Sequence, residues 1–256
     1  MKTYVIANQK GGIGKTTTAV CLSAILQDRG FRTLLIDGDV QGNSTDTYRA
    51  KVEGEATLYD VLLDERRIPL IDAVQHTEAG DIVASDPLLR EADKKLTTDV
   101  EGLYRMQDAI EELKRRDMYD YVVIDTAPTL NSLLHAILIS GSEVIIPLTA
   151  DRYSLQGLAQ LNESIQAIRR RQNKELKIAG LLLVKYSPRT LLARDVREVL
   201  DDIAQQMGTR VFEATIREST KAREAQAKRV PLIKYAPSST TELDYEAFAA
   251  ELLKEG

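Results

Sequence analysis

The sequence contains little cysteine, little net charge and no long hydrophobic run. Cys21 is the single cysteine among 256 residues, so the chain cannot form an internal disulfide and suits a reducing compartment. The formal net charge of −5 argues against nucleic-acid binding through overall charge, although it leaves room for a local basic surface. No apolar run reaches the roughly 18 residues that span a membrane. We therefore expect a cytoplasmic protein without a signal peptide.

Apolar runs alternate with segments of helical periodicity along the whole chain. This alternation, with no repeat, low-complexity linker or shift in composition, predicts one domain over residues 1–256. Consecutive strand, helix and strand form a βαβ unit, which requires a parallel sheet. The expected fold is α/β, a doubly wound and mostly parallel β-sheet flanked by helices. We expect strands near 3–7, 33–36, 81–84, 121–124, 143–148, 178–184 and 211–212, and helices near 15–29, 58–63, 102–116, 130–140, 154–173, 189–207 and 241–254.

A glycine-rich loop stands between the first expected strand and the first expected helix, with the sequence Gln9-Lys10-Gly11-Gly12-Ile13-Gly14-Lys15-Thr16-Thr17. Backbone N–H groups at the start of a helix can surround phosphate oxygens, and glycine permits their close approach. Lys15 can reach the β- and γ-phosphates, and the Thr16 hydroxyl can bind Mg²⁺. The loop therefore predicts ATP binding by Lys10, Gly11, Gly12, Ile13, Gly14, Lys15, Thr16 and Thr17.

Carboxylates follow two other expected strands. Asp37 and Asp39 come after the run at 33–36, and Asp125 comes after the run at 121–124. Because parallel strands end at one edge of the sheet, these acids should lie beside the loop. Asp125 is placed to hold Mg²⁺ through water. We assign Asp39 to positioning of the attacking water and Asp37 to an outer-shell metal contact, with capping of a turn or helix as the alternative for Asp37. The predicted metal site comprises Thr16, Asp37, Asp39 and Asp125.

The loop departs from the usual phosphate-binding pattern at two positions. Gln9 stands where glycine is usual, and Lys10 is a second lysine in addition to Lys15. A lysine at this position reaches phosphate only by folding back or by entering another subunit. There it would neutralise charge on the transferred phosphoryl group, as an arginine finger does. The alternative is a solvated loop lysine.

The motifs together resemble those of the ParA/Soj partition ATPases, which are relatives of MinD. The matching stretches are the deviant Walker A motif at 10–17, Asp37-Gly38-Asp39-Val40-Gln41-Gly42-Asn43 and Val122-Val123-Ile124-Asp125-Thr126-Ala127-Pro128, and the likeness extends to the C-terminal helix. The resemblance implies an ATP-dependent homodimer in which Lys10 of one subunit touches the nucleotide of the other. It further implies catalytic roles for Lys10, Lys15 and Asp39, slow Mg²⁺-dependent hydrolysis stimulated by a ParB-like partner, and non-specific binding of double-stranded DNA.

Two departures from the family pattern affect this expectation. Val40 replaces the proline that usually follows the second aspartate, and Arg217-Glu218-Ser219 replaces Pro-Arg-Asn, which leaves the adenine contacts open. The loop begins at residue 9, so we also expect no N-terminal helix-turn-helix module of the kind that some partition proteins carry.

The resemblance implies a DNA-binding surface made of late basic residues. The matching positions are Arg189 and Lys221, and Arg194 and Arg223 could lie on the same side. A positive patch of this kind would bind phosphates and would weaken steeply with salt. The alternative is a solvated helix face, because neighbouring acids dilute the charge; these acids are Glu198, Asp201, Asp202 and Glu224.

Four other functions can be weighed against DNA partition. A MinD-like membrane protein ends in a basic amphipathic helix, whereas the helix at 241–254 is acidic and would be repelled by anionic lipid. A nitrogenase-like iron–sulfur protein needs several cysteines, which Cys21 alone does not supply. A ParA-like ATPase that positions a protein cargo stays as the alternative. A ligase-like enzyme that uses ATP is a further alternative. The expected location is the cytoplasm, in association with the nucleoid.

Overall fold

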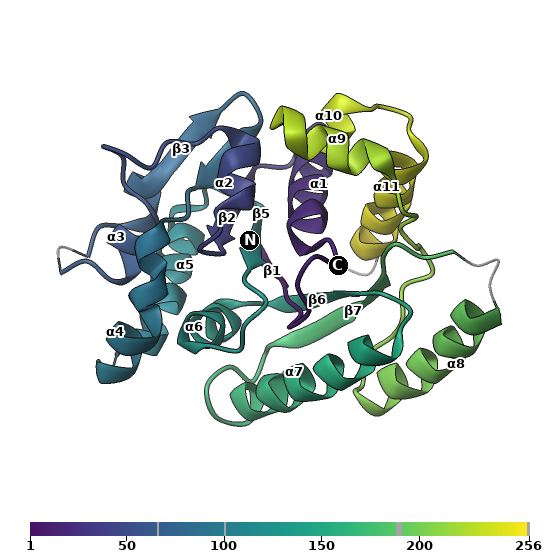
Figure 1. The fold of residues 1–256 in the computed structure, drawn as a ribbon. Coiled ribbons are helices and arrows are strands. Elements are labelled where there is room, and N and C mark those ends of the chain that lie inside the picture. Colours follow the sequence, from purple (N-terminus) through teal and green to yellow (C-terminus); the bar gives the residue numbers. More distant parts are fainter. Residues whose placement is uncertain (66, 100, 188–190, 255–256) are drawn as a thin grey trace.

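Within residues 1–65, 67–99, 101–187 and 191–254, which the computed structural model describes, the chain forms a seven-stranded sheet at its centre (Figure 1). The strand order is β3-β4-β2-β5-β1-β6-β7. Strands β3 and β4 are antiparallel, and the other neighbouring pairs are parallel. The strands are β1 Lys2–Ile6, β2 Thr33–Gly38, β3 Val74–Thr77, β4 Gly80–Val83, β5 Tyr121–Thr126, β6 Glu143–Leu148 and β7 Lys177–Leu183.

Helices cover both faces of the sheet, as Figure 1 shows. The α-helices are α1 Lys15–Asp28, α2 Asn43–Tyr48, α3 Leu58–Leu62, α4 Ala92–Thr98, α5 Arg105–Arg116, α6 Ser132–Ser140, α7 Arg152–Arg171, α8 Leu191–Gln206, α9 Thr220–Lys228, α10 Leu232–Tyr235 and α11 Thr240–Leu253. Short 3₁₀ segments lie at Leu70–Ala73, Pro87–Glu91 and Gly102–Tyr104. Among the described residues, no helix is long and apolar enough to cross a membrane.

Alternating side chains of each strand build two hydrophobic cores. In β1, Tyr4 and Ile6 belong to the core that also contains residues of α1, α10 and α11. Val5 enters the core on the other face, together with residues of α5, α6 and α7. Both faces of the central strands are therefore buried, which explains why these strands are continuous apolar runs in the sequence.

The predicted fold class is confirmed, and most predicted elements are present. The acidic C-terminal helix packs against α1 through Tyr245, Phe248 and Leu252, as its apolar positions indicate. Cys21 is buried in α1, and burial raises the pKa of its thiol. The thiol is therefore a core group rather than a nucleophile at neutral pH.

Two parts of the strand prediction are wrong. The segment at 211–212 is no regular strand: Val211 forms an isolated parallel bridge to Leu181, and the chain meets the edge of the sheet again only at the bridge between Ile216 and Val184. Strand β3 is absent from the prediction because its residues are polar and only half-buried, as expected for a short strand at the sheet edge.

Candidate nucleotide-binding site

Two glycines near the end of the loop between β1 and α1 have left-handed backbone conformations. Gly12 has a φ of 69° and Gly14, which precedes α1, has a φ of 101°. Only glycine adopts these conformations at little cost. A Cβ at Gly11, Gly12 or Gly14 would meet no atom within 4 Å, so the space in front of the loop is open to a ligand. Asn8 anchors the loop, since its Nδ2 donates to the Pro147 carbonyl at 2.7 Å and its Oδ1 accepts the Lys10 N–H at 3.0 Å.

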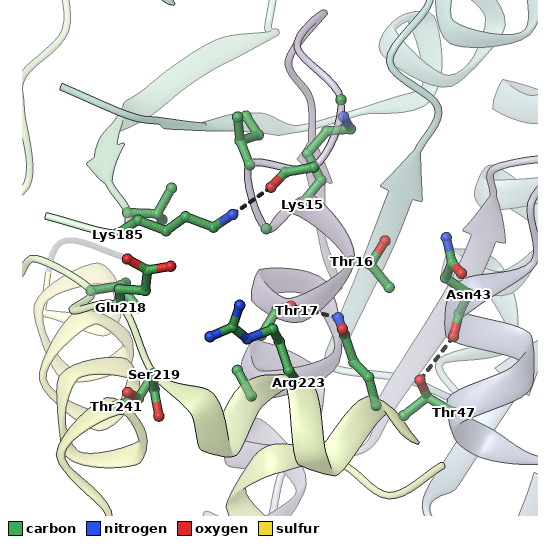
Figure 2. Close-up of a pocket in the computed structure, with 18 of the residues that line it drawn as sticks. Lys15, Thr16, Thr17, Asn43, Thr47, Lys185, Glu218, Ser219, Arg223 and Thr241 are labelled. Atoms are coloured by element: carbon green, nitrogen blue, oxygen red, sulfur yellow. Dashed lines mark hydrogen bonds between the residues drawn. The ribbon is translucent and has the colours of Figure 1, made fainter. Parts of the chain in front are cut away.

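A pocket of about 500 Å³ lies in front of this loop, within the range typical of small-molecule sites (Figure 2). The loop residues 11–17 form one wall of the pocket and Asp39 lies in another. The opposite wall comes from the segment after β7, from α9 and from α11. The pocket therefore joins the predicted phosphate loop to late segments of the chain.

Lys15 is almost completely buried at the base of the loop, where its Nζ donates to the Lys10 carbonyl at 3.0 Å. Burial lowers the pKa of Lys15, while the charges of Asp125 and Asp39 act to raise it. A cation that is shielded from water and surrounded by loop N–H groups is a strong site for an anion.

Asp37 and Asp125 face each other in the register of β2 and β5, directly under the loop. Both side chains are fully buried. Burial raises the pKa of Asp125 to about 7, and the charge of Asp37 adds to this rise. Burial likewise raises the pKa of Asp37 to about 6, although hydrogen bonds from Thr45 and from the Asp39 N–H oppose it.

The two buried acids have different partners. Asp37 Oδ2 accepts the backbone N–H and the hydroxyl of Thr45, both at 2.7 Å, and so holds the first turn of α2. This is the capping role that the sequence left as the alternative for Asp37. Asp125 Oδ2 accepts the Ser44 hydroxyl at 2.9 Å, whereas its Oδ1 is buried and accepts no hydrogen bond from the described residues.

The oxygen atoms of Thr16 and Asp125 suit a magnesium ion that is also bound by phosphate oxygens. Thr16 lines the pocket, and the buried Asp125 Oδ1 accepts no hydrogen bond from the part of the chain that the structure describes. Among the described residues, no three His, Cys, Asp or Glu side chains are grouped as a metal cage. Mg²⁺ keeps several waters and binds through one or two protein groups plus phosphates, so this sparse set suits it. The outer-shell role of Asp37 stays a prediction.

Asp39 lies at the pocket wall with its Oδ1 accepting the Gln41 N–H at 3.0 Å. The other carboxylate oxygen accepts no hydrogen bond within the described part of the chain. Asp39 can therefore hold a water molecule in the pocket, which is what its predicted role requires.

Lys10 points away from its own pocket. Its Nζ forms an ion pair with Asp151 Oδ2 at 2.6 Å and donates to the Thr149 hydroxyl at 3.1 Å. Burial acts to raise the pKa of Asp151, but the hydrogen bonds from Lys10 and Thr149 outweigh it and hold the pKa at about 2. Lys10 is consequently neither folded back onto its own pocket nor a free loop lysine.

The structure describes the side chains of two of the four predicted DNA contacts. Arg189 and the side chain of Arg194 lie outside the described residues. Lys221 is exposed on α9 and pairs with Glu224 Oε2 at 2.8 Å, so the expected dilution of charge by an acid is present. Arg223 is exposed, lines the nucleotide pocket and points into it (Figure 2), and its contact with DNA stays a prediction.

Sequence reasoning missed several residues of the far pocket wall. Lys185 has a positive φ of 52°, and its Nζ donates to the Gly12 carbonyl at 2.8 Å across the mouth of the pocket. Gln226 on α9 donates from Nε2 to the Thr17 hydroxyl at 3.2 Å. Neither residue belongs to a motif, because each meets the loop only through the tertiary fold.

Comparisons with known proteins agree with this geometry. A family described as an AAA domain matches residues 1–178. The chromosome partitioning protein ParA of Caulobacter vibrioides is 34% identical over 99% of this chain and 94% of its own length. The sporulation initiation inhibitor protein Soj of Bacillus subtilis is 33% identical over 100% of this chain and 99% of its own.

A solved structure extends the comparison to bound ligands. Cobyrinic acid a,c-diamide synthase from Mycobacterium smegmatis, with a bound ATP analog and magnesium, is 27% identical to this chain. The match has a TM-score of 0.83 and covers 100% of this chain and 95% of that one.

Proposed function

Because the chain belongs to the ParA/Soj family of P-loop ATPases, we propose that it hydrolyses ATP in a Mg²⁺-dependent cycle and uses this cycle to position DNA. ATP and Mg²⁺ are the cofactors of the site described above. One observation carries the proposal: a single pocket is lined by both the phosphate loop and Asp39, and Asp39 follows the strand whose Asp37 is paired in register with Asp125.

Each group in the pocket has a separate chemical task. The loop N–H groups and Lys15 bind the phosphates and neutralise their charge. Mg²⁺, when bound, neutralises charge on the β- and γ-phosphate oxygens. Thr16 and Asp125 would hold this ion, Asp125 through water. Asp39 orients the attacking water with its unpaired oxygen and accepts hydrogen bonds from it, so that the water is held in line with the γ-phosphate.

We propose that Lys10 acts across a dimer interface. Its ion pair with Asp151 is partly exposed, with each side chain 36% accessible, so releasing it costs roughly 1 kcal/mol or less. Contact with the partner's γ-phosphate would replace this ion pair by another charge-assisted hydrogen bond, to a group with more negative charge than a carboxylate. ATP, which has a γ-phosphate, would then favour the homodimer, and ADP would not.

The proposed cargo is DNA, bound non-specifically as duplex by the ATP dimer. A ParB-like partner, bound to a centromere site, would stimulate hydrolysis and so release the dimer from the nucleoid. Lys221 is exposed on α9, and Arg189 is the second proposed contact. Positive charges of this kind bind the phosphate backbone without reading its sequence.

The mass of the protein in solution tests the two-subunit site. Light scattering should give a dimer with ATP and a monomer with ADP or without nucleotide. Lys15→Ala should bind neither nucleotide and stay monomeric. Lys10→Ala should still bind ADP, but its partner-stimulated hydrolysis should fall by about 10³-fold, as for a removed arginine finger. Wild-type hydrolysis by Lys10→Ala would remove the cross-subunit role, and wild-type hydrolysis by Lys15→Ala would remove the P-loop assignment.

A further inference from the structure

Arg223 is an exposed arginine that lines the nucleotide pocket. Its side chain extends from α9 into the pocket, between Thr17 and Glu218 (Figure 2). Within the part of the chain that the structure describes, Arg223 forms no hydrogen bond and no ion pair. A guanidinium with five donors that faces an empty pocket is available to an anionic ligand.

The neighbouring cations of the same wall are already engaged. Arg217 forms a bidentate pair with Asp244, with Nη2 to Oδ1 at 2.6 Å and Nε to Oδ2 at 2.9 Å. Lys185 donates to the Gly12 carbonyl at 2.8 Å. Arg223 therefore differs from both in that binding a ligand would break no existing contact.

The position of α9 indicates which part of the nucleotide Arg223 reaches. Gln226, one helical turn further along α9, donates to the Thr17 hydroxyl at 3.2 Å, so this face of the helix lies at Thr17. Lys15 and Thr16 serve the β- and γ-phosphates and Mg²⁺. The next residue, Thr17, lies further into α1, toward the end of the phosphate chain that carries the sugar.

We propose that Arg223 binds the sugar-proximal phosphate of the bound nucleotide. The proposal rests on the proposed ATP site and adds to it a contact that ATP and ADP share. Glu218, on the far side of Arg223, would repel phosphate, so the uncharged nucleoside lies beside Glu218 and the phosphate chain beside Arg223. Helix α9 packs on the rest of the protein through the buried Ala225, and the Ser219 side chain caps its first turn.

Calorimetric titration of Mg²⁺–ADP and of a Mg²⁺-bound non-hydrolysable ATP analogue tests the contact. Arg223→Ala should lower the affinity for both ligands by the same factor, roughly tenfold, as expected for the loss of a charge-assisted hydrogen bond. Arg223→Lys, which keeps the charge, should recover most of the affinity. Lys228→Ala is the matched control, because Lys228 is exposed on the same helix and outside the pocket lining; it should bind both ligands as the wild type does.

The outcomes separate this proposal from the function on which it rests. Unchanged affinity of Arg223→Ala for both ligands would overturn the contact, and so would a loss confined to the ATP analogue, which would place Arg223 at the γ-phosphate. An equal loss in Lys228→Ala would also overturn it, because the effect would then be general to α9. Lys15→Ala that binds ADP normally would instead refute the P-loop assignment. Equal thermal unfolding midpoints of ligand-free Arg223→Ala and wild type confirm the fold, and Arg223→Gln replaces Arg223→Ala if they differ.

Discussion

At the scale of single residues, two buried carboxylates under the phosphate loop dominate the chemistry. Asp37 and Asp125 are opposite each other on adjacent strands, and burial raises the pKa of both. Ionising both at once is unfavourable in a site without a cation. The pair would therefore be favoured by a divalent ion: Asp37 is fixed by Thr45, and one oxygen of Asp125 accepts no hydrogen bond from the described residues.

The raised pKa of Asp125 predicts a pH dependence of stability. A carboxyl whose pKa is higher in the folded protein stabilises the fold fully below its unfolded pKa near 4, and this contribution is lost as the pH rises through about 7. Asp125→Asn stays neutral and has no such loss. Urea unfolding without nucleotide or Mg²⁺ should show the free energy of unfolding of the variant rising relative to wild type between pH 5 and pH 8. A difference that is constant over this range would contradict the shift.

Asp39→Ala should separate ATP binding from hydrolysis. The variant keeps the loop, Lys15 and Asp125, so ATP should still bind and produce the dimer, whereas the unpositioned water should slow hydrolysis by roughly 10²-fold or more. Light scattering with ATP and a phosphate-release assay measure the two effects. If Asp39→Ala failed to dimerise with ATP, the water-positioning role would have to be abandoned.

The residues that sequence could predict are those in local motifs. Lys15, Thr16 and Asp125 were found because a strand, a glycine loop and a strand-end acid have fixed spacing. Lys185 and Arg223 could not be found in this way, because they reach the pocket from segments far along the chain. The sequence suggests that Arg223 could lie on the same side as Lys221, but residues two apart on a helix point to nearly opposite sides, and Arg223 lines the pocket.

At the scale of elements, the packing of the late segment on β7 depends on a glycine. A Cβ on Gly180 would lie 2.6 Å from Phe212 Cε2, and Phe212 is itself packed edge-on against Phe248 at 5.0 Å between ring centroids. The segment that leads to the far pocket wall is thus fitted to the sheet through a close contact. Even a small increase in side-chain volume at this contact should lower the free energy of unfolding.

Gly180→Ala should lower the free energy of unfolding by about 1–3 kcal/mol through overpacking. Gly157→Ala, in α7, is the matched control: its Cβ would meet its nearest atoms at 3.8 Å, and alanine favours the helix by about 1 kcal/mol. Urea unfolding of both variants measures the difference. Equal changes in the free energy of unfolding of the two variants would show that Phe212 moves aside at little cost.

The elements that the sequence predicted best have strong apolar patterns on both faces or on one stripe. Strands β1, β5 and β6 are continuous apolar runs, and α5 places Met106, Ile110 and Leu113 on one buried face. The short α2 was missed because its six residues are polar and its first turn is held by Asp37, a contact that no periodicity contains.

Helix α9 also bears on the proposed DNA contact. Lys221 is exposed but paired with Glu224, which in turn accepts the Tyr235 hydroxyl at 2.9 Å. Lys221→Ala combined with Arg189→Ala should weaken DNA binding and flatten its salt dependence, while the ATP dimer persists. Filter binding at two salt concentrations measures this. Unchanged affinity for DNA would place the basic surface elsewhere.

At the scale of the whole molecule, one sheet holds both the phosphate loop and the acids beneath it, while the last third of the chain closes the pocket. The parallel arrangement of β2, β5 and β1 brings the strand ends together, as βαβ topology requires. The fold class followed from the sequence for that reason. The closure by α9 and α11 did not, because it depends on packing between distant segments.

We expect ATP, bound in this pocket, to control DNA binding. The most direct measurement is the affinity of the protein for duplex DNA of arbitrary sequence with ATP, with ADP and without nucleotide, each at low and high salt. We expect tight, salt-sensitive binding with ATP alone. Equal binding in all three nucleotide states, or no binding in any of them, would contradict the account.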